Sequence, residues 1–366
     1  MKKQYTMTIT AIALACFLAG CSTTNASTKQ NATTTTSVAA EDLFTKRDLA
    51  QTADTKDAKS ITLKSGSDVT ITKAGIYVLT GVAKNTTVYV ETEKTDKVQL
   101  VLDNVSITNE SAPCIYVKSA DKVFVTLTDK ESSLTVSGAF SSESDANPDG
   151  VIFSKDDLVI NGTGTLTVQS SKHGIVSKDD LKVTGGTINI QAQNKGLSAN
   201  DSIAIGGGTL AITAKEGMEA TQITVQDGKI DITASDDGIN ATQKSEESTP
   251  VFTLNGGTVT ITMGAGDTDG VDSNGDIYIN GGTISISGRS TFDYDGTAEY
   301  NGGTIIENGE ETNTITNQML GGPGGGQGGG PGGEPKDGDG PSGRPDGALK
   351  GGPKGGHGAD SNSEQK

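Results

Sequence analysis

A short motif that repeats along the middle of the chain constrains the fold more than any other feature of the sequence. Each copy contains two short strands of alternating apolar and polar residues with a glycine turn between them. The copies begin at Asp157, Asp180, Asp201, Ile223, Phe252 and Ile277. Each is accompanied by a marker glycine, which an apolar residue follows. The marker glycines are Gly150, Gly174, Gly196, Gly217, Gly238 and Gly270, at steps of 24, 22, 21, 21 and 32 residues.

Three short strands in each turn of about 22 residues, without helices, are typical of a parallel β-helix, in which successive coils stack. Inward aliphatic pairs such as Leu158/Ile160 predict a narrow apolar column inside the stack. Gly-Gly pairs such as Gly185-Gly186 supply the positive φ angles that tight corners need. We therefore predict an all-β fold, a parallel β-helix that forms one domain over residues 60–310. The marker glycines expected to stack in register are Gly174, Gly196, Gly217 and Gly238.

The composition agrees with a slender core. The chain of 366 residues has 4% aromatic residues and no tryptophan, too few bulky side chains for a wide globular core. A net charge of −17 disfavours a nucleic-acid partner, because phosphates would be repelled. Only two histidines are present, which argues against a Ser-His-Asp triad and against a histidine-rich metal site.

The N-terminus carries the features of an export signal. Lys2 and Lys3 precede a short apolar run over residues 9–19, which is typical of a signal peptide. The run ends Leu18-Ala19-Gly20-Cys21 and resembles a bacterial lipoprotein signal, with cleavage before Cys21 and lipidation of its thiol. An ordinary secretory signal is the alternative. We expect an extracytoplasmic protein that is lipid-anchored to the membrane at the cell surface.

Both ends of the mature chain are predicted to lie outside the β-helix. Residues 1–20 form the expected lipoprotein signal peptide, and residues 21–59 are a Thr/Ser-rich stretch that we interpret as a flexible linker. Residues 311–366 are a Gly/Pro-rich tail that is expected to be disordered, because it cannot bury a core. Cys114 is then the one thiol left without a modification, and we expect it to be buried and reduced.

Carboxylates gather beside the later marker glycines. The residue before the glycine is Glu216, Asp237 or Asp269, and equivalent residues of neighbouring coils lie about 5 Å apart. Two carboxylates at that distance repel by about 3 kcal/mol at an effective dielectric constant of about 20. A cation would relieve this repulsion, and oxygen ligands without His or Cys favour calcium over magnesium or zinc.

The predicted calcium ligands are Glu216, Glu219, Asp237, Asp269 and Asp272, with Asp236, Asn240 and Asp267 as further candidates. The alternative is a solvated acidic face with splayed side chains. The Asp-Asp pairs at strand entries, such as Asp156-Asp157 and Asp179-Asp180, are interpreted as turn chemistry.

A second acidic group adjoins two aromatic residues near the C-terminal coils. Carboxylates beside exposed rings suit sugar recognition, because rings stack on pyranose faces while oxygens hold hydroxyl groups or calcium. The candidate carbohydrate-binding residues are Phe292, Asp293, Tyr294 and Asp295. The two rings suit equally well a second role, in which they cap the end of the apolar column.

Several runs of the sequence resemble one bacterial family. They are Tyr116–Val123, Phe153–Leu158, Gly174–Leu181 and Ser235–Ile239. The family comprises surface-attached, calcium-binding, right-handed parallel β-helix proteins that bind carbohydrate and associate with cellulose and polygalacturonate. The resemblance covers about residues 60–310 and implies right-handed coils, bound calcium and a polysaccharide ligand. The chain departs from the family's repeated Asp-Gly at His173, Lys195 and Glu216, which concentrates the expected calcium sites around Asp237, Asp269 and Asp272.

These observations favour a non-catalytic, calcium-dependent carbohydrate-binding lipoprotein, expected to be a monomer, that holds acidic or plant-cell-wall polysaccharide near the cell. Calcium would bridge protein carboxylates to uronate carboxylates. A polysaccharide lyase or hydrolase is the enzymatic alternative, because such enzymes share the β-helix architecture. Asp237 and Asp269 are candidates for the carboxylate pair of a hydrolase. A structural surface scaffold is the third alternative.

Overall fold

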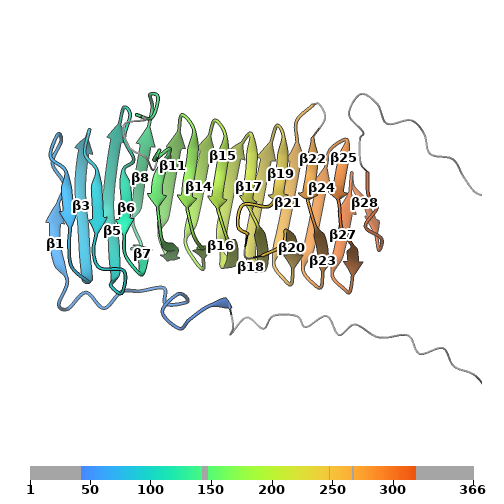
Figure 1. Ribbon diagram of the computed structural model, residues 1–366, viewed down its shortest axis with the longest axis horizontal. Helices are drawn as coiled ribbons and strands as arrows, with labels where there is room; N and C mark the ends of the chain where they lie inside the picture. Colours follow the sequence, from blue (N-terminus) through green and yellow to red (C-terminus); the bar gives the residue numbers. More distant parts are fainter. Residues whose placement is uncertain (1–42, 142–146, 247, 266–267, 319–366) are drawn as a thin grey trace, which may run out of the picture. The chain divides into compact units, whose positions relative to one another are not determined.

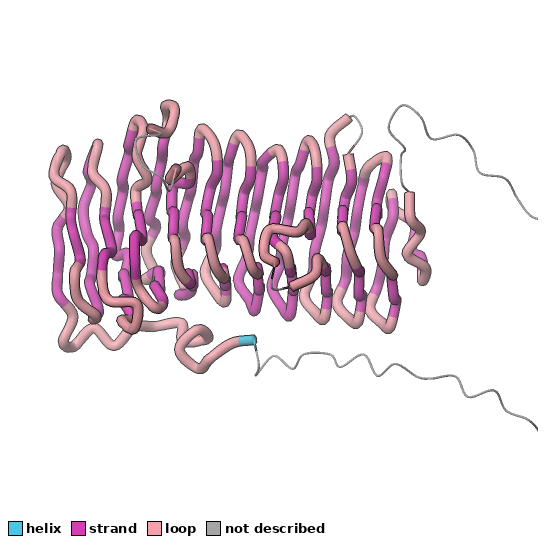
Figure 2. Tube along the Cα trace, in the orientation of Figure 1, coloured by secondary structure: helices cyan, strands magenta, loops and turns pink. Residues whose placement is uncertain are grey.

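A computed structural model describes residues 43–141, 147–246, 248–265 and 268–318. The expected signal peptide, Cys21 and Asp267 lie outside these residues. Apart from one helical residue at Leu43, the regular structure of the described residues is entirely strand (Figure 2). Within the same residues, no helix combines the length and the apolar character needed to span a membrane.

The strands form two sheets that wind around one core (Figure 1). The first sheet has ten strands, one for each coil, so the described chain makes ten coils. Its strands are β2 (Val69–Ile71), β4 (Val88–Glu91), β6 (Ile115–Ser119), β9 (Gly150–Ser154), β12 (His173–Ser177), β15 (Lys195–Ala199), β17 (Glu216–Ala220), β19 (Asp237–Ala241), β22 (Asp269–Ser273) and β25 (Ser290–Tyr294).

The second sheet has 18 strands and covers the rest of each coil. Its strands are β1 (Lys59–Thr62), β3 (Gly75–Lys84), β5 (Lys97–Asn109), β7 (Lys122–Leu127), β8 (Glu131–Val136), β10 (Asp157–Gly162), β11 (Thr165–Ser170), β13 (Leu181–Val183), β14 (Thr187–Ala192), β16 (Ser202–Ala214), β18 (Gln222–Ala234), β20 (Val251–Leu254), β21 (Thr258–Met263), β23 (Asp276–Ile279), β24 (Thr283–Ser287), β26 (Ala298–Tyr300), β27 (Thr304–Glu307) and β28 (Glu310–Thr312). Neighbouring coils pair in parallel, and β28 turns back antiparallel to β27. The predicted parallel β-solenoid is confirmed.

The core is a set of aliphatic ladders, in which each rung belongs to a different coil. One ladder is Leu166, Ile188, Leu210, Ile230, Val259, Ile284 and Ile305, paired in register from β11 to β27. All seven side chains have no exposed surface. Because each side chain packs on its equivalents above and below, small aliphatic residues fill the column and few aromatic residues are needed. Cys114 is also buried and reduced, as expected.

The marker glycines stack as predicted because each allows the next coil to approach. A Cβ added to Gly196 would lie 2.7 Å from the carbonyl oxygen of Gly217, and one added to Gly217 would lie 2.4 Å from that of Gly238. Real Cβ atoms do not approach backbone oxygens so closely, so any side chain here would push two coils apart. The Gly-Gly corners also behave as predicted, since Gly186 has a φ of 83°.

Residues 43–58, which we call the strap, correct the expectation of a flexible linker over residues 21–59. The strap lies along the outer surface of the second sheet (Figure 1). The ring of Phe44 is 5% exposed and packs against the backbone at Gly206. The guanidinium carbon of Arg47 lies 4.3 Å from the ring centroid of Phe124, which has no exposed surface although it points out of the solenoid.

Hydrogen bonds fasten the strap to the same sheet. The Gln51 side chain accepts a hydrogen bond from the backbone N–H of Gly162 at 3.0 Å and donates one to the carbonyl of Thr184 at 3.1 Å. The Asp48 carbonyl accepts from the side chains of Thr184 and Asn161. The strap has no strand periodicity, because its path follows the outward side chains of several coils, and so the sequence pattern gave no sign of it.

The C-terminal boundary also differs from the expectation. Residues 311–318, assigned above to a disordered tail, remain on the last coil. The backbone N–H of Gln318 donates to the carbonyl of Phe292 at 2.8 Å, and Ile315 packs against the core. Residues 319–366 lie outside the described part of the chain.

Candidate functional site: an acidic face on the ten-stranded sheet

Two rows of side chains run along the outer face of the ten-stranded sheet. In the strand Asp237–Ala241, the added Cβ of Gly238 would meet the side chain of Ile261, and Ile239 lies in the core. Asp237 and Asn240 are only half-buried and face outward on either side of this inward pair. The same pattern recurs in the neighbouring coils, so the first and the fourth residues of these strands build two parallel outer rows.

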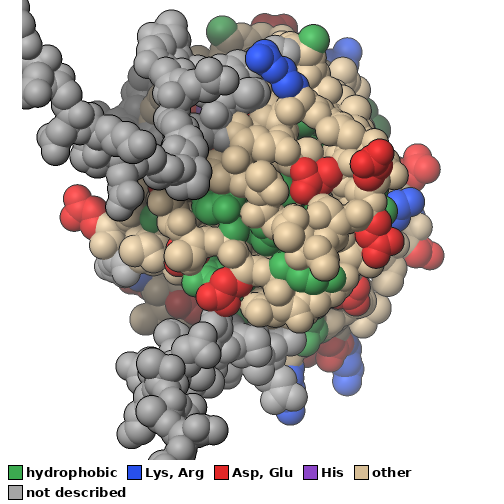
Figure 3. All heavy atoms as spheres, turned by 90° about the vertical axis from the view of Figure 1, so that its right-hand side faces the viewer, with side chains coloured by type: hydrophobic (Ala, Val, Ile, Leu, Met, Phe, Trp, Pro, Cys, Tyr) green, Lys and Arg blue, Asp and Glu red, His purple; other side chains and the backbone are tan. Residues whose placement is uncertain are grey.

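Both rows become acidic toward the C-terminal coils. Asp237 is paired in register with Asp269 in the first row. In the second row Glu219 is paired with Asn240, Asn240 with Asp272 and Asp272 with Asp293. We call this set of outward residues the acidic ladder; its members are Glu216, Glu219, Asp237, Asn240, Asp269, Asp272 and Asp293. Figure 3 looks onto the C-terminal end of the stack and shows Asp and Glu side chains on its rim.

The carboxylates of the ladder are held close enough to disturb one another. Burial, and then the charges of Asp272, Asp236, Glu216 and Asp269, raise the pKa of Asp237 to about 7. Burial, and then the charge of Asp293, raise the pKa of Asp272 to about 6. Both causes favour the neutral carboxyl group, as expected for acids that lack a compensating cation. In the described part of the chain, no lysine or arginine forms an ion pair with Asp237 or Asp272.

Asn240 supplies a further oxygen at this place. The amide nitrogen of Asn240 donates to Asp237 Oδ2 at 3.1 Å, and the amide oxygen takes no part in this hydrogen bond. That oxygen is buried and accepts no hydrogen bond from the described residues. A buried acceptor of this kind is satisfied by a donor or by a cation. The donor set at Asp237, Asn240 and Asp272 is therefore composed of oxygen atoms and fits a hard cation such as calcium.

Two predicted ligands lie in a different environment. Lys195 forms an ion pair with Glu216 at 3.2 Å, and Glu219 contacts both Lys195 and Lys244. Burial opposes ionisation of Glu219, but hydrogen bonds from the two lysines outweigh it and lower its pKa. Of the further candidates, Asp236 forms an ion pair with Lys215 at 2.8 Å. Among the described residues, Asp237 and Asp272 form no ion pair with a lysine, and both lie on the C-terminal side of Glu219.

The aromatic group at the last coil is corrected in part. Phe292 has no exposed surface and belongs to the core ladder beside Val271, so its ring cannot stack on a sugar. It caps the apolar column instead. Tyr294 is partly buried against the core, and its hydroxyl donates to the carbonyl of Ile315 at 3.4 Å. Asp293 continues the acidic ladder, and burial together with Asp295 raises its pKa.

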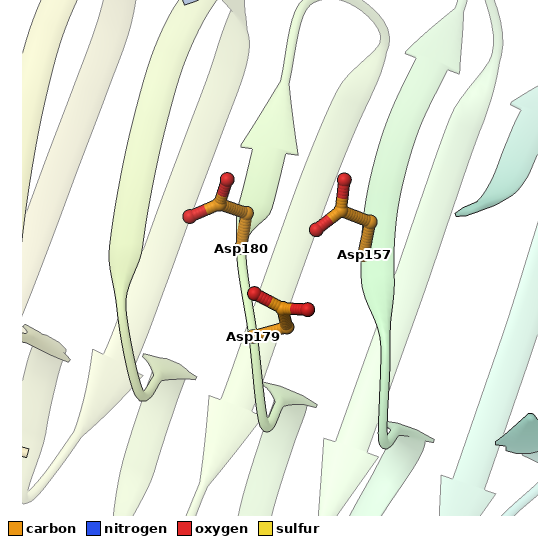
Figure 4. Close-up of side chains that lie close together, drawn as sticks. All are labelled: Asp157, Asp179 and Asp180. Carbon is orange, nitrogen blue, oxygen red and sulfur yellow. The ribbon is translucent and has the colours of Figure 1, made fainter. Parts of the chain in front are cut away.

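Three carboxylates lie closer together at another place, in residues that the sequence analysis interpreted as turn chemistry. Oxygens of Asp157, Asp179 and Asp180 lie within 4.8 Å of one another at the entries to β10 and β13 (Figure 4). Among the described residues this is the one group of three that is so compact. Asp157 forms an ion pair with Lys122 at 3.2 Å, and Asp180 accepts from Ser202 at 2.6 Å. Burial and neighbouring acids raise the pKa of Asp179 to about 6. The repeated Asp-Asp pairs, 23 residues apart, were the available signal.

The chain matches a known protein family. A family model described as carbohydrate-binding domain-containing protein matches residues 65–224 and 216–318. The chain belongs to this family. A curated protein of the same description from Acetivibrio thermocellus is 40% identical over 138 residues, 37% of this chain and 47% of that protein. The chain thus matches about half the length of this relative.

A solved structure is similar to this carbohydrate-binding family member over most of its length. It is described as a polysaccharide lyase-like protein from C. thermocellum, in a gadolinium derivative. It is 31% identical with a TM-score of 0.52, and the match covers 68% of this chain and 96% of that chain. Membership of the family supports a carbohydrate-binding role for the described domain.

The outer face of this carbohydrate-binding domain also carries an aromatic row that the sequence reasoning missed. Tyr89, Tyr116 and Phe153 occupy the second outer row in consecutive coils, in line with the acidic ladder. The ring centroids of Tyr89 and Tyr116 lie 5.8 Å apart, and those of Tyr116 and Phe153 lie 5.5 Å apart at 83°. Tyr89 is half-buried. The sequence pattern that could have predicted this row is an aromatic residue at the same position in three consecutive coils.

Proposed function

We propose that the protein is a non-catalytic, calcium-dependent carbohydrate-binding lipoprotein of the bacterial cell surface. Its ligand is an acidic polysaccharide of the polygalacturonate type. The acidic ladder carries this proposal, because the half-buried carboxyl groups of Asp237 and Asp272 have raised pKa values and form no ion pair with a lysine among the described residues. Calcium bound there neutralises the ladder and offers coordination positions to the carboxylates of a uronate chain.

The arrangement of the face suits a polymer that lies along the stack. Neighbouring coils are about 4.8 Å apart, comparable with the length of one sugar unit, so that a regular chain meets equivalent positions coil after coil. An acidic ligand on an acidic face requires an intervening cation. This requirement makes calcium dependence the property to test first.

Calcium should stabilise the folded chain, because the fold assembles ligands from separate coils. A site at a calcium concentration about 100 times its Kd would add about 2.7 kcal/mol to the free energy of unfolding. We expect the variant Asp237→Asn/Asp269→Asn to lose most of the calcium-induced rise in Tm. Asp231→Asn is the matched control, because Asp231 is exposed and lies on the other sheet. An unchanged rise in the double variant would place the calcium elsewhere, with Asp157, Asp179 and Asp180 next to be tested.

Anchorage by a lipid at Cys21 belongs to the same proposal and rests on the residues Leu18-Ala19-Gly20-Cys21. Mass spectrometry of the protein from membranes should show an N-terminal acylated cysteine at position 21. An unmodified N-terminus at another residue would contradict this part of the proposal and leave the carbohydrate site unaffected.

A calcium-dependent lyase is the second candidate, favoured by the description of the structural neighbour as polysaccharide lyase-like. A lyase removes the proton on the carbon beside the uronate carboxylate, breaks the neighbouring C4–O glycosidic bond so that its oxygen leaves, and forms a carbon–carbon double bond in the product. Because this double bond absorbs ultraviolet light, the absorbance of the solution would rise when the protein is incubated with polygalacturonate and calcium. We expect binding without such a rise.

A further inference from the structure

Two lysine ammonium groups occupy oxygen-lined positions on the coil that begins the acidic ladder. The nitrogen of Lys195 lies 3.2 Å from Glu216 Oε2 and also contacts Glu219. The nitrogen of Lys244 contacts the other carboxylate oxygen of Glu219 and lies 3.0 Å from the hydroxyl oxygen of Ser198. Each positive charge is thus held by oxygen atoms, as a metal ion would be.

The carboxylates of these two glutamates are deeply buried, so each needs a positive charge close to it. The side chains of Glu216 and Glu219 are 10% and 9% exposed. A buried carboxylate that loses its positively charged partner strongly destabilises the fold. The two lysines prevent this destabilisation on this coil. On the next two coils Asp237 and Asp272 are half-buried in the same outer rows and have no such partner among the described residues.

The two lysines reach the glutamates from different parts of the chain. Lys195 begins β15 and lies opposite Glu216 in the parallel register. Lys244 belongs to the segment between β19 and β20, which makes the step between marker glycines longer here than elsewhere. The backbone N–H of Lys244 donates to Thr221 Oγ1 at 2.9 Å, which holds the start of this segment over β17. The inserted segment therefore delivers a cation to Glu219.

We infer that Lys195 and Lys244 take the place of a metal ion on the Glu216–Glu219 coil and so confine calcium to the coils from Asp237 onward. The inference rests on the proposed calcium site of the later coils. It assigns to the inserted segment a definite role, which is to set the boundary of the metal-binding region. Removing the two ammonium groups would leave two carboxylates and a serine hydroxyl, a set of hard oxygen ligands that suits calcium.

The test is the calcium stoichiometry of Lys195→Met/Lys244→Met, measured by isothermal titration of the full mature chain with calcium chloride. We expect one more calcium ion for each chain than in the wild type, and a larger calcium-induced rise in Tm. Adding Glu219→Gln to this variant should remove the extra ion. Lys130→Met is the matched control, because Lys130 pairs with Asp103 on an exposed surface and should leave the stoichiometry unchanged.

Equal stoichiometry in the double variant and the wild type would overturn the inference. If the double variant does not fold without calcium, folding that is restored by calcium supports the inference, because the metal then replaces the lost ammonium groups. If the double variant does not fold in calcium either, the calcium-induced rise in Tm is measured for the single variant Lys244→Met. A rise no larger than that of the wild type would then overturn the inference. Absence of calcium binding in the wild type would instead reject the proposed function.

Discussion

Gly217 shows how single residues set the distance between coils. A Cβ at this position would meet the carbonyl oxygen of Gly238 at 2.4 Å and a methyl group of Ile232 at 2.6 Å. Neither neighbour can move freely, because one is backbone and the other is a buried core residue. The requirement for glycine here comes from close approach of two coils.

We expect Gly217→Ala to lower the free energy of unfolding by about 1–3 kcal/mol, the usual cost of overpacking a core. Gly264→Ala is the matched control, because an added Cβ there would meet no atom closer than 3.4 Å. Chemical denaturation of both variants measures the difference. A Gly217→Ala variant as stable as the control would show that the coils separate without strain.

The carboxyl group of Asp237 also leads to a prediction at this scale. Its folded-state pKa of about 7 lies above the ordinary value of 3.8, so the folded chain binds more protons than the unfolded chain between these values. The calcium-free protein should therefore lose stability as the pH rises from about 4 to about 7. Calcium competes with these protons, so the calcium-induced rise in Tm should be larger at pH 8 than at pH 5.

Thermal melting of calcium-free and calcium-loaded protein at the two pH values tests this prediction. Asp237→Asn should weaken the pH dependence of the calcium-free form, because the amide does not titrate. A calcium-free Tm that increases from pH 5 to pH 8 in the wild type and not in the variant would contradict the assigned environment of Asp237.

Among the elements, the strap changes the picture of the N-terminal region most. It covers Phe124, whose ring points away from the core yet has no exposed surface. Without the strap, the ring of Phe124 would face solvent on the second sheet, and exposed apolar surface promotes association. The strap is thus part of the folded domain.

Phe44→Ala should destabilise the attachment of the strap by about 1.5–3 kcal/mol, the value for burying such a side chain. We expect faster proteolytic cleavage within residues 43–58 and retention of the solenoid fold. Leu49→Ala is the control on the same segment, because Leu49 is 46% exposed. Equal cleavage rates in Phe44→Ala and Leu49→Ala would show that Phe44 does not hold the strap.

At the scale of the whole molecule, the sequence was informative wherever the chain repeats. The period of the marker glycines predicted the coils, and the alternation of residues such as Ile188 and Ile190 predicted which side chains face the core. Parallel stacking then followed, because equivalent residues of successive coils must pair. The strap has no period, and so nothing in its residues predicted where it lies.

The candidate site could be predicted only in outline for a related reason. The register of the coils places Asp237 beside Asp269, which the spacing predicted. The partners of Glu219 depend on how far lysine side chains reach, and Lys244 comes from an inserted segment outside the repeat. Phe292 was ambiguous, because an inward and an outward ring have the same sequence pattern at the last coil.

The measurement that tests the central claim most directly is the binding of polygalacturonate oligomers by isothermal titration, with calcium and after its removal. The account predicts binding in calcium, loss of binding without it, and loss in Asp237→Asn/Asp269→Asn even when calcium is present. The Asp231→Asn control should bind as the wild type does. Binding that persists without calcium, or that is unchanged in the double variant, would contradict the account.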